Sequence, residues 1–137
     1  MRILIVEDDF VSRLLLQKML TSYGMCEIAV DGQEAVDAFK MALEEKNPYD
    51  FICLDIMMPG MDGREALKQI RSIEKEKGIG GFDHAKIIMT TALKDTDNVM
   101  GSFKDQCDGY IVKPIDKQKL LGKMIELGLI SNDQNSK

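Results

Sequence analysis

The sequence contains few cysteines, a single histidine and no long apolar run. Its three cysteines, Cys26, Cys53 and Cys107, are scattered and match no zinc-binding spacing, so they predict reduced thiols in a cytoplasmic protein. No apolar run approaches the roughly 18 residues that a membrane span requires. The apolar block at residues 3–6 is too short for a signal segment. These absences predict a cytoplasmic protein with no membrane attachment.

Positive charge is not in excess either. The 18 basic residues are outnumbered by 23 acidic residues, which gives a net charge of −5 at pH 7. Modules that bind nucleic acid are usually basic, so we expect no nucleic-acid partner. The 137 residues, 45% of them hydrophobic, correspond to one ordinary domain with a single core.

Short blocks rich in Ile, Leu and Val alternate along the chain with segments of helical periodicity. The blocks predict buried strands at residues 2–6, 26–30, 51–54, 86–90 and 110–112. The segments between and after them predict helices at residues 11–23, 35–43, 64–77, 95–107 and 117–129. This alternation implies an α/β fold with a parallel sheet and helices on both faces. We expect one domain over residues 1–130 and a disordered polar tail over residues 131–137.

The helical segments also predict which side chains are buried. Five apolar residues of the first helix recur at helical spacing and are expected to pack inward, namely Val11, Leu14, Leu15, Met19 and Leu20. The acids Glu44, Glu45, Glu74 and Glu76 are typical of solvated helix faces. The glycine-rich stretch 78–84 follows no strand and opens no helix, so it predicts a flexible connection in which His84 is solvated.

Polar side chains follow four of the five predicted strands. They are three acids after the first strand, one acid after the third, a threonine after the fourth and a lysine after the fifth, namely Glu7, Asp8, Asp9, Asp55, Thr91 and Lys113. Parallel strands bring their carboxyl ends to one edge of the sheet, where ligands bind in open α/β folds. We therefore expect these side chains to converge.

The chemistry of this set suits a phosphoryl acceptor. Carboxylates without histidine or cysteine form a hard-oxygen site for Mg²⁺ or Mn²⁺, with Asp8 and Asp55 as direct ligands and the Met57 carbonyl nearby. Lys113 adds a point charge for phosphate oxygens, and the Thr91 hydroxyl can donate to one. Taken singly, each residue has a simpler explanation, such as a helix cap or a turn. Only their joint occurrence favours the functional interpretation.

Four motifs carry a resemblance to a known family. They are Val6-Glu7-Asp8-Asp9, the run over residues 54–63, Thr91-Ala92 and Lys113-Pro114, each at the end of a predicted strand. With them, residues 2–129 resemble the receiver domain of bacterial two-component response regulators, in its single-domain, CheY-like form. The resemblance implies a flavodoxin-like, doubly wound, three-layer α/β/α fold. Its five parallel strands would lie in the order 2-1-3-4-5, with five helices.

The resemblance implies the residues of phosphorylation and switching. Asp55 is expected to be the phosphoacceptor, and Lys113 and Thr91 are expected to hold the phosphoryl oxygens. Thr91 is also the expected switch hydroxyl, and Tyr110 the switch aromatic. The bond between Lys113 and Pro114 is expected to be cis.

The resemblance also implies the residues of a metal site for Mg²⁺ or Mn²⁺. Asp8 and Asp55 are expected to ligate the ion directly, and Met57 through its backbone carbonyl. Glu7 is expected to act through water. Its side chain is longer than the aspartate often found at this place in the family.

Partners follow from the same resemblance. A sensor histidine kinase or a histidine phosphotransfer protein would supply the phosphoryl group. No DNA-binding domain follows residue 129, so output is expected through a protein target in chemotaxis, motility or a phosphorelay. The face expected to change shape comprises residues 95–107, 110–112 and 117–129. The protein would be a monomer or a homodimer linked to phosphorylation.

On this interpretation the protein is not an enzyme. It would be a phosphoacceptor with self-catalysed phosphotransfer and autodephosphorylation only. One alternative is a small metal-dependent phosphatase with an aspartyl nucleophile, although Met57 stands where such enzymes usually carry a second acid. Another is a receiver-like binding module that acts without phosphate.

Overall fold

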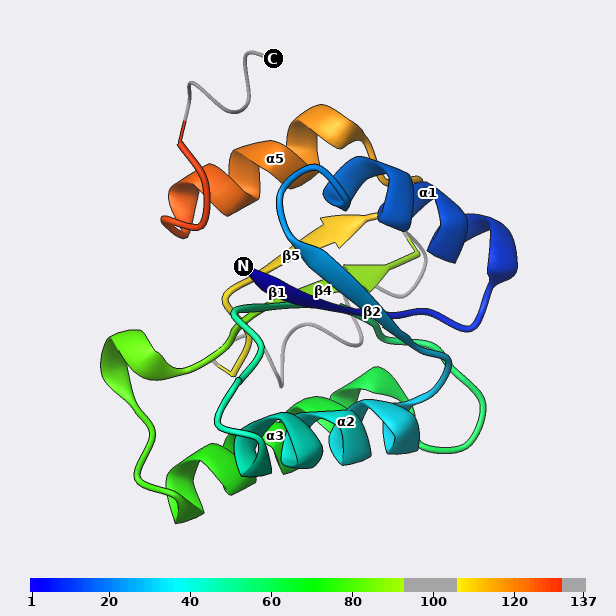
Figure 1. Ribbon diagram of the computed structural model, residues 1–137. Coiled ribbons are helices and arrows are strands. Elements are labelled where there is room, and N and C mark those ends of the chain that lie inside the picture. Colours follow the sequence, from blue (N-terminus) through cyan, green and yellow to red (C-terminus); the bar gives the residue numbers. More distant parts are fainter. Residues whose placement is uncertain (93–105, 132–137) are drawn as a thin grey trace.

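The fold is built on five parallel strands. The computed structural model describes residues 1–92 and 106–131. The strands are β1 (Arg2–Val6), β2 (Met25–Ala29), β3 (Phe51–Asp55), β4 (Lys86–Thr91) and β5 (Gly109–Val112). They lie in the order β2-β1-β3-β4-β5, and every pairing is parallel (Figure 1). The predicted sheet and its order are confirmed, and each strand lies within one residue of its predicted bounds.

Helices cover both faces of the sheet. On one face lie α1 (Phe10–Leu20) and α5 (Lys117–Glu126), and on the other lie α2 (Gly32–Glu44) and α3 (Gly63–Glu76) (Figure 1). The described residues thus contain four α-helices where five were predicted. The helix predicted at 95–107 lies outside the described residues, except for Gln106 and Cys107, which are not helical.

Aspartates begin all four described α-helices. The N-cap residues are Asp9, Asp31, Asp62 and Asp116, and each accepts a backbone N–H from the first turn of its helix. The last helix ends at Glu126, three residues before the predicted end, because Gly128 adopts a positive φ of 76° that terminates it.

Two apolar cores lie on the two faces of the sheet. Along β3, Phe51 and Cys53 belong to the core under α1 and α5, whereas Ile52 and Leu54 belong to the core under α2 and α3. Alternation along a strand produces this division. The same alternation assigns each residue of the other strands to one face of the sheet.

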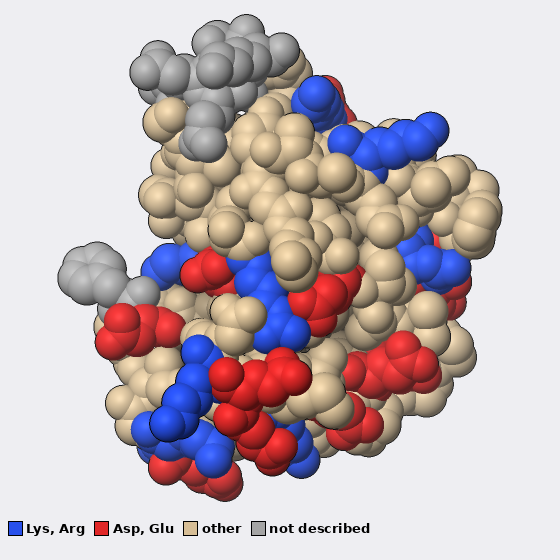
Figure 2. Space-filling view, in the orientation of Figure 1, with Lys and Arg blue, Asp and Glu red and all other residues tan. Residues whose placement is uncertain are grey.

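The apolar row predicted for α1 is wrong in its main part. Val11, Leu14 and Leu15 are 62%, 41% and 50% exposed, whereas Leu16 and Leu20 are buried. The helix carries two apolar rows, and its docking angle decides which row packs on the sheet. Figure 2 shows that charged side chains gather over the layer of α2 and α3, while the layer of α1 and α5 is largely uncharged on this face.

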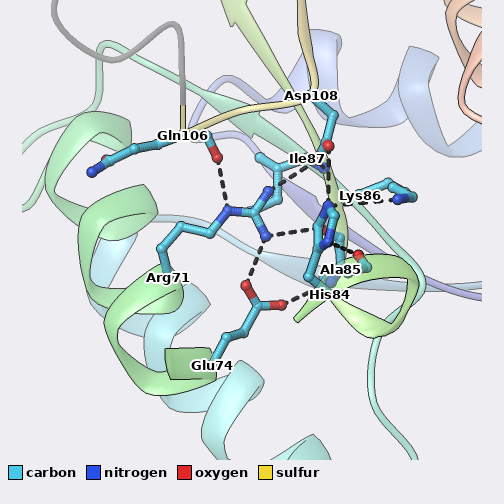
Figure 3. Close-up of polar contacts among 9 residues, drawn as sticks. Arg71, Glu74, His84, Ala85, Lys86, Ile87, Gln106 and Asp108 are labelled. Carbon is cyan, nitrogen blue, oxygen red and sulfur yellow. Dashed lines mark hydrogen bonds and ion pairs between the residues drawn. The ribbon is translucent and has the colours of Figure 1, made fainter. Parts of the chain in front are cut away.

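A polar network joins α3 to the amino ends of β4 and β5, at the opposite edge from the carboxyl ends. We call Arg71, Glu74, His84 and Asp108 the Arg71 network (Figure 3). The Arg71 guanidinium donates to Glu74 at 2.7 Å and to Asp108 at 2.9 Å. It also donates to the carbonyl oxygens of Ala85 and Gln106 at 2.9 and 2.7 Å. Arg71 therefore connects α3 to the residues immediately before β4 and β5.

Two sequence-based expectations fail at this network. Glu74 was expected to be solvated, but it is 3% exposed and accepts the Ala85 N–H at 2.8 Å. His84 was also expected to be solvated, but its Nε2 lies 3.2 Å from Asp108 Oδ1 and its Nδ1 contacts the Gly81 carbonyl. The stretch 78–84, predicted to be a flexible connection, contains the short 3₁₀ helix η1 (Gly81–Asp83).

Of the helices within the described ranges, none combines the length and the apolar character that crossing a membrane would demand.

Candidate functional site

Three carboxylates converge at the carboxyl edge of the sheet. Glu7 and Asp8 follow β1, and Asp55 ends β3, so the parallel pairing of β1 with β3 brings them together. One carboxylate oxygen from each residue lies within 4.8 Å of the others. Glu7 and Asp55 are 0% and 4% exposed, while Asp8 is exposed to solvent. The site thus has two buried acids and one acid at its mouth.

Lys113 joins this cluster from the end of β5. Its ammonium Nζ lies 3.0 Å from Glu7 Oε2 and 3.3 Å from Asp55 Oδ1. Alternation along β5 puts Lys113 on the same face as Ile111, which belongs to the core under α1 and α5. The bond from Lys113 to Pro114 is cis, as the resemblance implied.

Burial and charge act in opposite directions on this cluster. Burial, together with the charge of Glu7, raises the pKa of Asp55 to about 7, although Lys113 opposes the shift. Burial disfavours the charged form of Lys113, but hydrogen bonding to Glu7 and the charge of Asp55 outweigh it and raise the pKa of the ammonium. A single cation is therefore shared between two buried carboxylates.

Asp9 has a different task from the other acids after β1. Its carboxylate accepts the Ser12 N–H at 2.9 Å and caps α1. This hydrogen bond holds the pKa of Asp9 below its ordinary value. The Asp9 N–H in turn donates to Glu7 Oε1 at 3.1 Å, so the start of α1 orients the Glu7 side chain.

The loop after β3 folds back against Asp55. The Gly63 N–H donates to the Ile56 carbonyl at 2.8 Å, and a Cβ at Gly63 would lie 2.1 Å from the Asp55 carbonyl oxygen. Only glycine fits this approach. Gly63 is the last residue of the run 54–63 that carries the family resemblance. Met57, which is 52% exposed, lies in the loop that follows Asp55.

The two expected switch residues lie on the other face of the sheet. Thr91 is fully buried, and its hydroxyl donates to the Ala92 carbonyl at 3.2 Å. Tyr110 pairs in register with Met89, a member of the core under α2 and α3, and is 37% exposed. Alternation puts Thr91 on the same face as Met89.

A polar residue next to Thr91 was missed from the sequence. Thr90 pairs in register with Asp55, and two residues before it Ile88 belongs to the core under α1 and α5. Period-two alternation would have shown that Thr90, and not Thr91, shares a sheet face with Asp55.

The donor set fits Mg²⁺. Glu7, Asp8 and Asp55 offer carboxylate oxygens only, within the span of one cation. Hard divalent ions prefer such ligands. The buried oxygen Glu7 Oε2 lies 3.0 Å from the Lys113 ammonium, so this carboxylate is already held by one cation.

Comparisons with known proteins agree with this arrangement. The model of the response regulator receiver domain family matches residues 3–125. The chain is 35% identical over 131 residues to "Probable histidine kinase 2" of Oryza sativa subsp. indica, covering 88% of this chain. It spans only 12% of that kinase's length.

Two solved structures are similar over most of the chain. One is the CheX-CheY-BeF3-Mg²⁺ complex from Borrelia burgdorferi, with a TM-score of 0.76 and 31% identity. The other is a Saccharomyces cerevisiae co-crystal of the histidine phosphotransfer protein Ypd1 with the receiver domain of Ssk1, with a TM-score of 0.78 and 31% identity. Each likeness covers 93% of this chain and 88% of the other.

Proposed function

This chain belongs to the response regulator receiver domain family, and from that premise we propose that it accepts a phosphoryl group on Asp55 from a phosphohistidine. The observation that carries the proposal is the shared ammonium of Lys113, 3.3 Å from Asp55 Oδ1 and 3.0 Å from Glu7. It puts positive charge beside a buried nucleophile, where negative charge gathers during phosphoryl transfer.

The reaction is a displacement at phosphorus. An Asp55 carboxylate oxygen forms the new bond to phosphorus, the phosphorus–nitrogen bond of the phosphohistidine breaks, and the donor imidazole leaves. Lys113 turns its ammonium toward the phosphoryl oxygens. Thr91 ends β4 at the same edge of the sheet, and its hydroxyl turns from the Ala92 carbonyl to hold one of these oxygens. Asp8, Asp55, the Met57 carbonyl and, through water, Glu7 would hold Mg²⁺, which supplies further positive charge to the phosphoryl oxygens.

Output is proposed to pass through the side of the sheet that carries β5 and α5. The added group brings about −1.5 to −2 charges at neutral pH. Thr91 moves toward it, and Tyr110 turns into the space that Thr91 leaves, which biases a two-state equilibrium. A protein target in chemotaxis, motility or a phosphorelay binds the altered face. This chain would bind that target as a monomer or as a homodimer formed on phosphorylation.

The exposed apolar row of α1 is proposed as the surface that meets the phosphodonor. Phe10 and Leu15 are 65% and 50% exposed. A pocket of about 400 Å³ is lined by Leu15, Met19, Lys113 and Pro114. A donor protein seated there would hold its phosphohistidine at the edge that carries Asp55. The occupant we infer is a histidine phosphotransfer protein, the class of partner present in the yeast co-crystal.

Asp55→Asn tests the chemistry. We expect the wild type to be labelled by acetyl phosphate with Mg²⁺ and the variant to remain unlabelled, because the amide is not a competent nucleophile. Removal of Mg²⁺ by a chelator should also stop labelling. The matched control is Asp62→Asn, which changes a capping aspartate at the same edge and should keep labelling. Undiminished labelling of Asp55→Asn would refute the assignment.

The enzyme alternative is tested in the same experiment. We propose one phosphoryl transfer followed by autodephosphorylation, and not turnover of a substrate. Sustained release of phosphate from an excess of a phosphomonoester would instead favour the small phosphatase.

Leu15→Ala tests the donor surface. Because Leu15 is half exposed, its truncation should change folding stability little. Transfer from a phosphorylated histidine phosphotransfer protein should slow by about tenfold, while labelling by acetyl phosphate should stay at the wild-type rate. Met41→Ala, which truncates a 59% exposed residue on α2, is the control. Equal transfer rates for the wild type and Leu15→Ala would rule out this surface.

A further inference from the structure

Arg13 places a cation on the loop that carries the acids after β1. It is the fourth residue of α1, and its guanidinium donates from Nη1 to the carbonyl oxygens of Glu7 and Asp8 at 3.0 and 3.4 Å. The dipole of a helix disfavours positive charge near its amino end. The position of the Arg13 cation therefore needs a reason other than the stability of α1.

A second contact restrains the same guanidinium. Its central carbon lies 5.5 Å from the centroid of the Phe10 ring, a distance at which a cation is attracted to an aromatic face. Arg13 is half-buried. The guanidinium is therefore held against the loop after β1, and it does not extend freely into solvent.

The contact with the Asp8 carbonyl orients a whole peptide group. In a trans peptide, the carbonyl and the N–H of the next residue point in opposite directions, and the bond between Asp8 and Asp9 is trans. The Asp8 carbonyl faces Arg13, so the Asp9 N–H faces away from it. That N–H donates to Glu7 Oε1 at 3.1 Å. Arg13 thereby fixes the direction of the donor that holds the Glu7 carboxylate.

This series of contacts reaches the phosphoacceptor. Glu7 Oε2 lies 3.0 Å from the Lys113 ammonium, which lies 3.3 Å from Asp55 Oδ1. Asp8 is exposed to solvent, so the place of its carboxylate depends on the backbone more than that of buried Glu7 does. Groups that orient metal ligands without touching the ion raise the affinity of a metal site.

We infer that Arg13 is a positioning residue, which orients the backbone of Glu7 and Asp8 and, through the Asp9 N–H, the Glu7 carboxylate for Mg²⁺ and Lys113. The inference rests on the proposed function of Asp55, since it gives Arg13 a task at that site. It also explains why a cation lies near the amino end of α1.

Arg13→Met removes the guanidinium and keeps a long apolar side chain. In calorimetric titration with MgCl₂, the affinity should fall by about tenfold, because the ligands are no longer oriented before the ion binds. Charge alone predicts the opposite sign, since loss of a cation beside three carboxylates would strengthen Mg²⁺ binding. Without metal, amide hydrogen exchange of Asp9 should become faster by about fivefold, which corresponds to one ordinary hydrogen bond.

Lys18→Met is the matched control. It removes the same charge from an exposed position of α1, so both measurements should stay within about twofold of the wild type. Mg²⁺ affinity of Arg13→Met that equals or exceeds that of the wild type would overturn the inference. Unchanged exchange of the Asp9 amide would overturn it as well.

The outcomes separate this inference from the proposed function. Neither measurement uses a phosphodonor, so a wild type that binds Mg²⁺ but is not labelled by acetyl phosphate overturns the proposed function of Asp55 alone. A labelled wild type together with unchanged Mg²⁺ affinity in Arg13→Met overturns the inference alone. A wild type that does not bind Mg²⁺ overturns both.

Discussion

The carboxyl edge and the amino edge of the sheet both carry carboxylates beside one basic side chain, but these carboxylates are paired with hydrogen-bond donors to different extents. At the carboxyl edge, one lysine serves two buried carboxylates, Glu7 and Asp55. At the amino edge, Arg71 serves Glu74 and Asp108, and each of these carboxylates also accepts a backbone N–H. Figure 3 shows the Arg71 network between α3 and the residues just before β4 and β5.

The difference shows what partnering does to a buried charge. A carboxylate with every acceptor satisfied is stabilised and inert, and it locks the elements around it. A carboxylate with too few donors has a raised pKa, and it is ready to gain a cation or a phosphoryl group. The predictions below test this contrast, from the largest expected effect to the smallest.

Asp55→Asn should change the pH dependence of stability most. With its pKa raised from 3.8 to about 7 in the folded chain, Asp55 makes the folded state bind more protons than the unfolded state between these values. Wild-type stability should therefore fall as pH rises through this window. The variant has no carboxyl group to titrate at this position. Its free energy of unfolding relative to that of the wild type should therefore increase across the window by up to about 4 kcal/mol, at about 1.4 kcal/mol per pKa unit. Urea unfolding from pH 4 to 8 in chelator measures it.

Asp62→Asn is the control of opposite sign. Burial of Asp62 is outweighed by Arg64 and by backbone N–H groups, which hold its pKa below the ordinary value. Its carboxylate stabilises the fold above its ordinary pKa, and this stabilisation is lost as pH falls through the lowered pKa. The penalty of the substitution should therefore be largest at neutral pH. If the difference in stability between Asp55→Asn and the wild type did not depend on pH, the proposed contrast between the two edges would be wrong.

Arg71→Met should destabilise the fold by about 3 kcal/mol, because it leaves Glu74 buried without its cation. Urea unfolding at pH 7 measures the loss. Labelling of Asp55 in the folded variant should remain at the wild-type rate, since the Arg71 network lies at the other edge. Lys75→Met, on an exposed side of α3, should change stability by less than about 0.5 kcal/mol. If Arg71→Met lowered stability by less than about 0.5 kcal/mol as well, the Arg71 network would not be stabilising the fold.

His84→Ala should have the smallest effect, about 1 kcal/mol, because the imidazole is partly exposed, although it contacts Asp108 and the Gly81 carbonyl. Amide hydrogen exchange over residues 81–85 should become faster. Asp83→Ala, at an exposed position of the same stretch, is the comparison. Exchange that is the same in both variants would mean that the imidazole does not anchor this connection.

Local patterns sufficed for the strands and for the residues at their ends. Apolar blocks of four or five residues read as strands, and Asp55 and Lys113 were identified because parallel strands end at one edge. The Arg71 network could not be found in this way. Glu74 sits on a charged helix, and only the packing of α3 against Ala85 shows that it is buried.

Packing direction explains the other errors. The spacing of Val11, Leu14 and Leu15 on α1 is helical, as predicted, but the rotation of the helix on the sheet exposes them and buries Leu16. Thr90 escaped notice because a threonine in a strand is common. Among the described residues its hydroxyl has no hydrogen-bond partner, and only the packed structure shows this.

The sequence by itself determined the order of strands and helices and the acids and the lysine at the carboxyl edge, and the family resemblance of its motifs implied the cis bond before Pro114. These follow from periodicity and motifs, which depend on neighbours along the chain. Tertiary structure alone decided which face of α1 is open to solvent and which carboxylates are fully paired. These depend on contacts between distant segments, where burial sets the cost of every unpaired polar group.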